Sequence, residues 1–361
     1  MLAKAAGTAA RRARHGALRQ LSASAKAAEA LPLVDLSRSD EEAAEELRVA
    51  AGRFGFFYVS NHGVPREVEE GAFTALASFF ANEEVKGSIH QSKTGSFRGY
   101  VGPFEQGDYG MDDTDLRKDQ TTQGADKEAE AKAAMDYKEL FHFGTELPRD
   151  HAVYNDLLYC DNIWPNNDPS VFREPMSVYY EEVRQLSDRL LRVSALALGL
   201  EPEFFVRQAS ETPMTSMNCL HYPPLETGEL GSQIGIGAHT DFECLTILNM
   251  RGTNDPCLEI IRPEDGAWMP VAPREGCFVV NVGDMLARWS GDTFRSTVHR
   301  AFNHPRDHRY SIAFFRGPDF DASLAPQVGN KEKYMPPVNA GKHMLARITQ
   351  ANPGAVAADS A

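Results

Sequence analysis

Hydrophobic residues recur at helical spacing in three stretches of the first two hundred positions. A helix is predicted over residues 40–53, which are rich in Ala, Glu and Leu and follow a capping box formed by Ser39 and Glu42. A second helix is predicted over residues 65–81. The longest is predicted over residues 175–200, where apolar residues recur every three or four positions. These are Val178, Val183, Leu186, Leu190, Val193 and Leu196.

Runs typical of β-strands are short and gather in the second half of the chain. Two precede the long helix, at residues 31–37 and 54–59. After residue 200 such runs recur between Gly, Pro, Asn and Asp turns, at 245–248, 257–261, 277–282 and 310–315. Evenly spaced short strands indicate a sandwich or jelly-roll. Helices first and strands afterwards predict an α+β class with one β core.

Composition narrows the kind of protein. The chain has 361 residues, of which 42% are hydrophobic and 24% charged, and is long enough for one large domain or two small ones. No apolar run approaches the roughly 18 to 20 residues needed to cross a bilayer, so we expect no membrane span. The five cysteines show no C-x-x-C spacing, which gives no sign of a zinc knuckle or a disulfide framework.

Charge is divided unevenly along the chain. Residues 1–28 contain six Lys or Arg and no Asp or Glu, a composition typical of a transit peptide. We expect import into a mitochondrion, with a plastid or cytoplasmic location and a disordered basic arm as alternatives. Removing those six charges from the net charge of −14 leaves −20 for residues 29–361. This argues against nucleic acid as a partner and favours a small-molecule substrate. The sequence does not indicate an oligomeric state.

The predicted elements divide the chain into four parts. Residues 1–28 are the transit peptide or arm, and residues 29–174 form a region of helices and strands. Residues 175–348 hold the long helix and the jelly-roll core, and residues 349–361 are expected to be a disordered tail.

His239-Thr-Asp241 is the first candidate for metal binding. On a strand, residues two apart point to the same face, so both side chains can reach one ion. With 11 histidines in the chain, His-x-Asp is expected to occur by chance roughly 0.5 times, so the pair alone carries little weight. His299 adds weight, because it ends a run, 294–299, that is typical of a later strand of the same core. Two His and one carboxylate leave three positions open, as Fe(II) needs for a bidentate cosubstrate and O₂. The alternative is a buried hydrogen-bonded pair of His239 and Asp241.

Arg309-Tyr-Ser311 places a guanidinium and a hydroxyl on one face of another predicted strand. A buried arginine requires an anionic partner. Arg309 follows His299 by ten residues, and we expect its strand to be adjacent to that of His299. It could then bind the far carboxylate of a five-carbon diacid whose other end chelates iron. The alternative is a core salt bridge with an acid such as Asp284.

Taken together, these motifs resemble the isopenicillin N synthase-like family of 2-oxoglutarate and Fe(II)-dependent dioxygenases. The resemblance covers about residues 31–348 and is closest to the microbial and fungal branch. It rests on His239-x-Asp241, His299-Arg300, Arg309-x-Ser311, Val280-Asn-Val-Gly-Asp284, Gly55-Phe-Phe-Tyr-Val-x-Asn-His-Gly63 and Gly235-Ile-Gly-Ala-His-Thr-Asp241. Many plant members carry Asn two residues before the tyrosine that matches Tyr222, whereas this chain has Leu220, which points away from the plant hormone and flavonoid oxidases.

The resemblance implies a double-stranded β-helix (jelly-roll, cupin-like) core with flanking N-terminal helices. It also implies Fe(II) at His239, Asp241 and His299, with the distal carboxylate of 2-oxoglutarate on Arg309 and Ser311 and Tyr222 lining the same pocket. The function it implies is oxidation, most simply hydroxylation, of a small molecule by O₂ with release of succinate and CO₂. Two alternatives stay open: an Fe(II) oxidase that does not use 2-oxoglutarate, and a non-catalytic protein that binds a small ligand. Six residues are candidates for the substrate pocket: Arg98, Tyr100, Phe242, Trp268, Trp289 and Phe315.

Overall fold

The computed structural model describes residues 31–106, 136–166, 168–225 and 234–351. The predicted transit peptide, residues 1–28, lies outside this range. The last helix, α11 (Ala340–Ala351), covers the first three residues of the expected tail at 349–361, and the rest of that tail is not described. No helix in the described ranges is long and apolar enough to cross a membrane.

Most strands belong to one large sheet. Its eight strands lie in the order β1-β2-β10-β7-β12-β5-β4-β3. The pairs are antiparallel except β1 with β2, which is parallel. Their bounds are β1 Leu33–Asp35, β2 Phe56–Ser60, β3 Gly99–Val101, β4 Glu139–Gly144, β5 Pro213–Tyr222, β7 Leu245–Arg251, β10 Cys277–Val282 and β12 Arg309–Asp319.

A smaller antiparallel sheet faces the large one. Its order is β6-β11-β8-β9, with β6 Ile234–His239, β8 Leu258–Ile261, β9 Trp268–Val271 and β11 His299–Phe302. An apolar cluster occupies part of the space between the sheets, where it joins Leu220, Tyr222 and Ala313 of the large sheet to Ala301 of the small one. Two facing sheets with helices on the outside confirm the predicted α+β class and double-stranded β-helix core.

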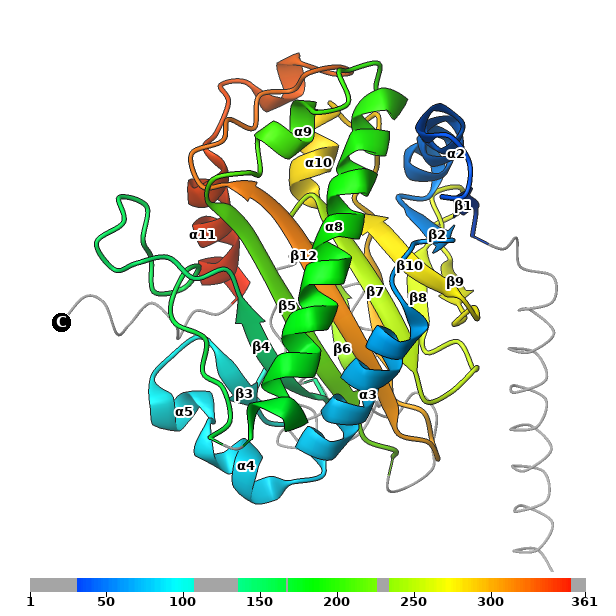
Figure 1. Ribbon diagram of the computed structural model, residues 1–361. Helices are drawn as coiled ribbons and strands as arrows, with labels where there is room; N and C mark the ends of the chain where they lie inside the picture. The colour runs from blue at the N-terminus through cyan, green and yellow to red at the C-terminus, as the bar shows by residue number, and fades with distance from the viewer. Residues whose placement is uncertain (1–30, 107–135, 167, 226–233, 352–361) are drawn as a thin grey trace, which may run out of the picture.

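Helices cover the outer face of the large sheet (Figure 1). The capping box of α2 forms as predicted, with Ser39 accepting from the Glu42 N–H. In α8, Met176, Tyr179, Val183, Leu186, Leu190 and Val193 form the buried stripe, while Val178 is exposed. The bounds are α2 Asp40–Arg53, α3 Arg66–Phe80, α4 Glu83–Ser88, α5 Gln91–Thr94, α8 Arg173–Ala197, α9 Phe204–Arg207 and α10 Asp284–Trp289, with short 3₁₀ helices at Pro169–Val171 and Glu332–Tyr334.

Three local expectations were wrong. Asp241 lies just after β6 instead of within it, and His299 begins β11 instead of ending a strand over 294–299. β12, which carries Arg309, is not adjacent to β11: the two belong to different sheets. Arg309 therefore faces the metal-binding residues across the space between the sheets.

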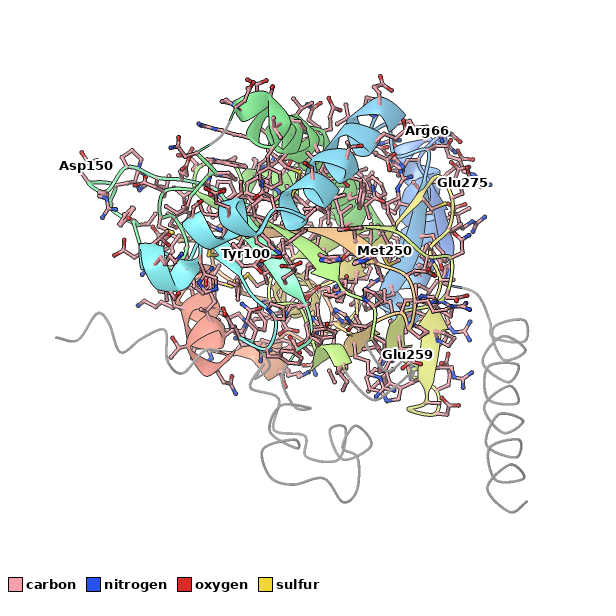
Figure 2. The ribbon with its side chains drawn as sticks, turned by 90° about the horizontal axis from the view of Figure 1, so that it is seen from below. Arg66, Tyr100, Asp150, Met250, Glu259 and Glu275 are labelled. Atoms are coloured by element: carbon pink, nitrogen blue, oxygen red, sulfur yellow. The ribbon has the colours of Figure 1, made fainter. Side chains whose placement is uncertain are left out.

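Charged side chains surround this core. Figure 2 shows Arg66, Asp150 and Glu275 at the edge of the molecule and Tyr100 and Met250 nearer its centre. Tyr100 is buried and Met250 partly buried, whereas the other three are exposed. Several buried polar residues, among them Asp241, His299 and Arg309, line one cavity between the two sheets.

Candidate functional site

His239, Asp241 and His299 converge at one end of the space between the sheets. β6 and β11 pair directly at His239 and His299, which brings their ring centroids to 4.2 Å. One donor atom from each of the three residues lies within 4.8 Å of the others. A single cation can therefore contact all three.

Both imidazole rings are oriented by backbone carbonyls. The Nδ1 atom of His239 lies 2.8 Å from the carbonyl oxygen of Gly237, and that of His299 lies 3.1 Å from the oxygen of Thr297. A carbonyl only accepts, so Nδ1 carries the proton and Nε2 keeps its lone pair. Both Nε2 atoms face Asp241 Oδ1, at 3.5 and 3.7 Å. This is the ligand orientation that metal-binding histidines adopt.

Two side chains of the large sheet orient the Asp241 carboxylate. Asn281 Nδ2 donates to Oδ2 at 2.7 Å, and Thr246 Oγ1 donates to the same oxygen. Oδ1 is left facing the two histidines. Neither donor is predicted as a site residue from the sequence, although an asparagine inside the apolar strand 277–282 is an unusual residue that could have indicated one of them.

The geometry favours a metal site over a simple hydrogen-bonded pair. At 3.5 Å, His239 Nε2 and Asp241 Oδ1 are too far apart for a good hydrogen bond, and His299 is almost equally close to the same oxygen. Burial opposes ionisation of Asp241, yet the neighbouring His299 and His239 hold its pKa below the usual range. Burial lowers the pKa of His299 to about 4 and so favours its neutral ring, whereas Asp241, acting against burial, raises the pKa of His239. An ionised carboxylate beside a neutral imidazole is a donor set suited to a divalent cation.

Arg309 lies at the opposite end of the same space, on the inner face of β12. Its side chain is buried, with 2% of its surface exposed, and no carboxylate in the described ranges lies within ion-pair distance. Its Nη1 atom has no hydrogen-bond partner there, and Nη2 lies 3.4 Å from the sulfur of Met250. The alternative of a salt bridge with Asp284 was wrong, because Asp284 contacts Ser296, Thr240 and Arg347. The Arg309 guanidinium is therefore a buried charge that has no anionic partner among the described residues.

Ser311 and Tyr222 complete this end of the space. Ser311 Oγ is buried and has no hydrogen-bond partner in the described part of the chain, and the Arg309 guanidinium lies 4.3 Å from the centre of the Tyr222 ring. Arg309 pairs directly with Tyr222 across β12 and β5. At Gly235, a Cβ would lie 2.7 Å from the Tyr222 ring, so a side chain there would crowd it. The space is suited to the carboxylate end of a small anion.

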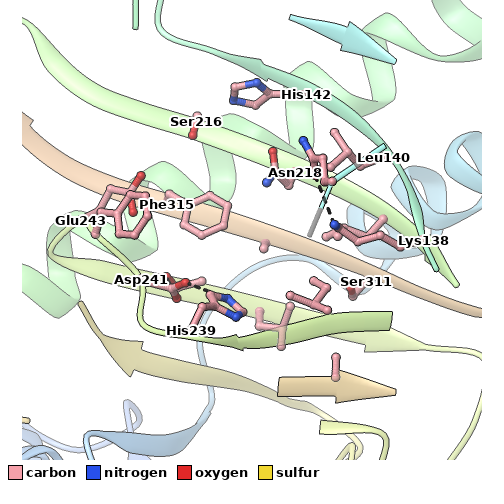
Figure 3. Close-up of a pocket in the computed structure, with 18 of the residues that line it drawn as sticks. Lys138, Leu140, His142, Ser216, Asn218, His239, Asp241, Glu243, Ser311 and Phe315 are labelled. Atoms are coloured by element: carbon pink, nitrogen blue, oxygen red, sulfur yellow. Dashed lines mark hydrogen bonds and ion pairs between the residues drawn. The ribbon is translucent and has the colours of Figure 1, made fainter. Parts of the chain in front are cut away.

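The three metal-binding candidates and the Arg309 end line one cavity of about 250 Å³. Figure 3 shows His239, Asp241 and Ser311 in this cavity, together with Glu243, Phe315, Ser216 and Asn218. Burial, together with the carboxylates of Asp241 and Asp284, raises the pKa of Glu243 to about 8. Glu243, Ser216 and Asn218 are not among the site residues predicted from the sequence. The alternation of side chains along β5 could have indicated Ser216 and Asn218, because both lie on the same face of the strand as Leu220 and Tyr222.

The six candidates for the substrate pocket divide evenly. Arg98, Phe242 and Phe315 line the cavity. The others have structural contacts: the Trp289 ring stacks on Phe205, Trp268 lies under the Arg300 guanidinium, and the Tyr100 hydroxyl donates to the buried Glu139.

Two family models match the chain. Residues 31–167 match the model described as the N-terminal region of non-haem dioxygenases in morphine synthesis. Residues 212–318 match that of the 2OG-Fe(II) oxygenase superfamily. The second model contains all six residues discussed above, His239, Asp241, His299, Arg309, Ser311 and Tyr222.

Similar proteins include fungal enzymes. The clavatol oxidase of Penicillium crustosum is 31% identical over 88% of this chain and 96% of its own length. A 2-oxoglutarate-dependent dioxygenase of Talaromyces stipitatus is 30% identical over 89% and 95%.

Solved structures agree with these sequence matches. A putative 2OG-Fe(II) oxygenase family protein of Caulobacter crescentus superposes with a TM-score of 0.73 at 28% identity, covering 90% of this chain and 99% of the other. A full-length protein of Neurospora crassa, solved in complex with alpha-KG, gives 0.70 at 26% identity, covering 88% and 96%.

Proposed function

Because the chain belongs to the 2OG-Fe(II) oxygenase superfamily, we propose that His239, Asp241 and His299 hold its iron and that Arg309, Ser311 and Tyr222 bind the distal carboxylate of 2-oxoglutarate. The protein is a 2-oxoglutarate and Fe(II)-dependent dioxygenase that acts on a small molecule. The observation that carries the residue assignment is the buried Arg309 Nη1 atom, which has no partner in the described ranges. An incoming carboxylate supplies that partner.

We propose hydroxylation as the reaction. Bound Fe(II), with 2-oxoglutarate and O₂, supplies an oxidant for a C–H bond: one oxygen atom goes to the product hydroxyl, the other to succinate, and CO₂ is released. The carbonyls of Gly237 and Thr297 keep both imidazoles directed at the metal. Thr246 and Asn281 hold Asp241 so that Oδ1 faces the same point. The protein thus supplies positioning and a cavity sheltered from water.

Succinate formation tests this function. Protein reconstituted with Fe(II) without oxygen is exposed to O₂ with 2-oxoglutarate and no other substrate. We expect slow succinate production that stops when 2-oxoglutarate is omitted, and faster production when a substrate is found in a panel of small metabolites. O₂ consumption at full rate with a substrate but without 2-oxoglutarate would establish the oxidase alternative. Absence of turnover with every compound would favour a binding protein.

The location of the protein is a separate proposal. We infer import into a mitochondrion from the six basic and no acidic residues among positions 1–28. A fluorescent fusion of residues 1–28 is expected to accumulate in mitochondria, and the same fusion with its four arginines changed to glutamine is not. Accumulation in plastids, or an intact Met1 on protein purified from its native cell, would contradict the proposal.

A further inference from the structure

A second buried guanidinium, that of Arg98, lies at the end of a row of residues that crosses the inner face of the large sheet. The row consists of Thr246 in β7, Phe315 in β12, Ser216 in β5 and Gly144 in β4, each paired directly with the next. A Cβ on Gly144 would lie 2.9 Å from Arg98 Nη1, so the guanidinium occupies the space that a side chain would fill there. Thr246, at the opposite end of the row, holds the metal-binding carboxylate.

The row sets the distance between Arg98 and the metal site. Neighbouring strands lie about 4.8 Å apart, so the three steps from Thr246 to Gly144 cover roughly 14 Å. Along the strands, the row is six residues, or roughly 20 Å, from the pair formed by Tyr222 and Arg309. A molecule of 2-oxoglutarate bound at Arg309 is too short to reach Arg98 as well. Arg98 therefore faces the part of the cavity that is left for the substrate.

Arg98 has hydrogen-bond partners but no carboxylate. It is 1% exposed and lines the cavity, and no acid in the described ranges lies within ion-pair distance of it. Nη1 donates to His142 Nε2 at 2.7 Å, and Nη2 donates to the Leu158 carbonyl at 2.6 Å. His142 is neutral, because its Nδ1 donates to the Phe97 carbonyl and burial, together with Arg98, lowers its pKa to about 3. The Nε atom of Arg98 is buried with no hydrogen-bond partner among the described residues.

Glu243 does not supply the missing charge. It lines the same cavity, and Figure 3 shows it beside Phe315. It is not within ion-pair distance of Arg98, and its own charged neighbours are the carboxylates of Asp241 and Asp284. Whichever protonation state Glu243 adopts, the Arg98 guanidinium has no carboxylate in contact.

The other cations of the cavity are already paired. Lys138 and Arg300 line it, and each contacts an acid of the protein, at 2.6 and 2.8 Å respectively. Among the residues that the structure describes, Arg309 and Arg98 are the cavity-lining cations without a carboxylate partner. Arg309 receives the distal carboxylate of 2-oxoglutarate in the proposed function. A buried unpaired charge is costly, so a second anion at Arg98 is favoured, and the substrate is the molecule that can bring it.

Much of the cavity wall is apolar. The apolar side chains that line it include Phe97, Leu157, Leu158, Met214, Phe242 and Phe315. Burial of apolar surface against such a wall is favourable. The wall therefore suits a substrate whose remaining atoms are mostly carbon and hydrogen.

We propose that the substrate is a small carboxylic acid with an apolar body, whose carboxylate binds Arg98 while a C–H bond of the body lies at the metal. This inference rests on the proposed function and names the substrate class of the same cavity. Arg98 is then a specificity determinant that holds the end of the substrate remote from the reacting carbon. Contacts of about 3 to 4 Å at each end leave roughly 7 Å of the row for the molecule, about the length of 3-phenylpropionate.

Matched ligands test the preference for a carboxylate. Anaerobic protein loaded with Fe(II) and saturating 2-oxoglutarate, which occupies Arg309, is titrated in a calorimeter with phenylacetate, 3-phenylpropionate and 4-phenylbutyrate, each against its uncharged amide. We expect 3-phenylpropionate to bind about tenfold or more tightly than its amide, as a charge-assisted hydrogen bond in a buried site allows. 3-Phenylpropylamine, which has a similar length and a positive charge, should bind more weakly than either.

Variants of the row test whether Arg98 is the cause. Arg98→Gln should remove the preference, and Arg98→Lys should retain part of it. Ser216→Asp keeps the contacts of Arg98 and places a carboxylate near it, because Ser216 Cα and Arg98 Nη1 both lie 2.9 Å from the position of a Cβ on Gly144. This variant should lose the preference, whereas the isosteric Ser216→Asn should keep it. Arg66→Gln, which changes an exposed arginine paired with Glu70, is the control and should behave as wild type.

Each outcome decides the matter. The inference is overturned if all three amides bind as tightly as their carboxylates, or if the preference survives in Arg98→Gln or in Ser216→Asp. If Arg98→Gln does not fold, the two Ser216 variants decide. A preference that appears only in Glu243→Gln would show that Glu243 balances Arg98, and would also overturn the inference.

Failure of the inference and failure of the proposed function are distinguishable. If wild-type protein still turns 2-oxoglutarate into succinate when the carboxylate preference is absent, the proposed function stands and only the substrate class is wrong. If no succinate forms under any condition, the proposed function fails, and this inference fails with it.

Discussion

At the scale of single residues, the site depends on which atoms already have partners. Asp241 Oδ2 accepts from Asn281 and Thr246, while Oδ1 faces the two histidines. At the other end of the cavity, Arg309 Nη1 and Ser311 Oγ are buried without a partner in the described ranges. Atoms that already have hydrogen-bond partners fix the orientation of a metal-binding side chain. Buried polar atoms without such a partner indicate where a bound molecule supplies one.

Removal of one metal-binding residue tests the first half of this argument. We expect Asp241→Ala or His299→Ala to abolish iron binding and activity while the fold persists, because two remaining side chains cannot hold Fe(II) at low concentration. Metal analysis after reconstitution, with circular dichroism for the fold, measures both effects. His151→Ala removes an exposed histidine outside the site and should keep its iron. Full activity in either site variant would refute the assignment.

Replacement of Arg309 tests the second half. Arg309→Gln removes a charge-assisted contact and leaves a carboxylate unpaired in a buried pocket, which costs several kcal/mol, or roughly two or more decades in apparent affinity. We expect the loss in the KM for 2-oxoglutarate. Arg309→Lys keeps the charge but not the planar guanidinium fork, so its KM for 2-oxoglutarate should fall between those of the wild type and Arg309→Gln. A loss confined to the KM of the main substrate would instead support the oxidase alternative.

At the scale of elements, the local sequence pattern predicted most helices and strands correctly, but it predicted less well which strands lie next to one another. The α8 stripe and the Ser39 capping box depend on neighbours within a few residues, which the sequence displays directly. Whether β12 lies beside β11 depends on contacts across the whole core, and the alternation of a strand indicates its faces but not its neighbour. The same limit hid Thr246 and Asn281, whose role appears only when Asp241 folds back beside them.

Helix α8 offers a matched pair of substitutions. Leu190 has no exposed surface and lies on the stripe that packs in the core, whereas Val178 on the same helix is 51% exposed. We expect Leu190→Ala to lower the free energy of unfolding by about 2–5 kcal/mol, because it leaves a cavity. Val178→Ala should change it by about 0.5 kcal/mol or less. Urea denaturation of both variants measures this, and equal effects would mean that the buried face is misassigned.

At the scale of the whole molecule, the two parts matched by separate family models share one sheet. β1, β2, β3 and β4 come from the first part, and β5, β7, β10 and β12 complete the same sheet. The buried Glu139 of β4 joins them further, because it accepts from Lys86, Tyr100 and His221. The first part is therefore an integral piece of the fold instead of an independent domain.

Ligand binding should consequently stabilise the whole molecule. His239 and His299 belong to the small sheet and Arg309 to the large one, so 2-oxoglutarate bound to the metal would link the two sheets. A ligand at a hundred times its Kd that binds only the folded state adds about 2.7 kcal/mol, which raises the Tm by several degrees. Using Mn(II) in place of Fe(II) to avoid turnover, we expect one rise in Tm on adding metal and a second on adding 2-oxoglutarate, both reversed by a chelator. Arg309→Gln should lose only the second rise and Asp241→Ala should lose both. A second rise that persists in Arg309→Gln would place the cosubstrate elsewhere in the cavity.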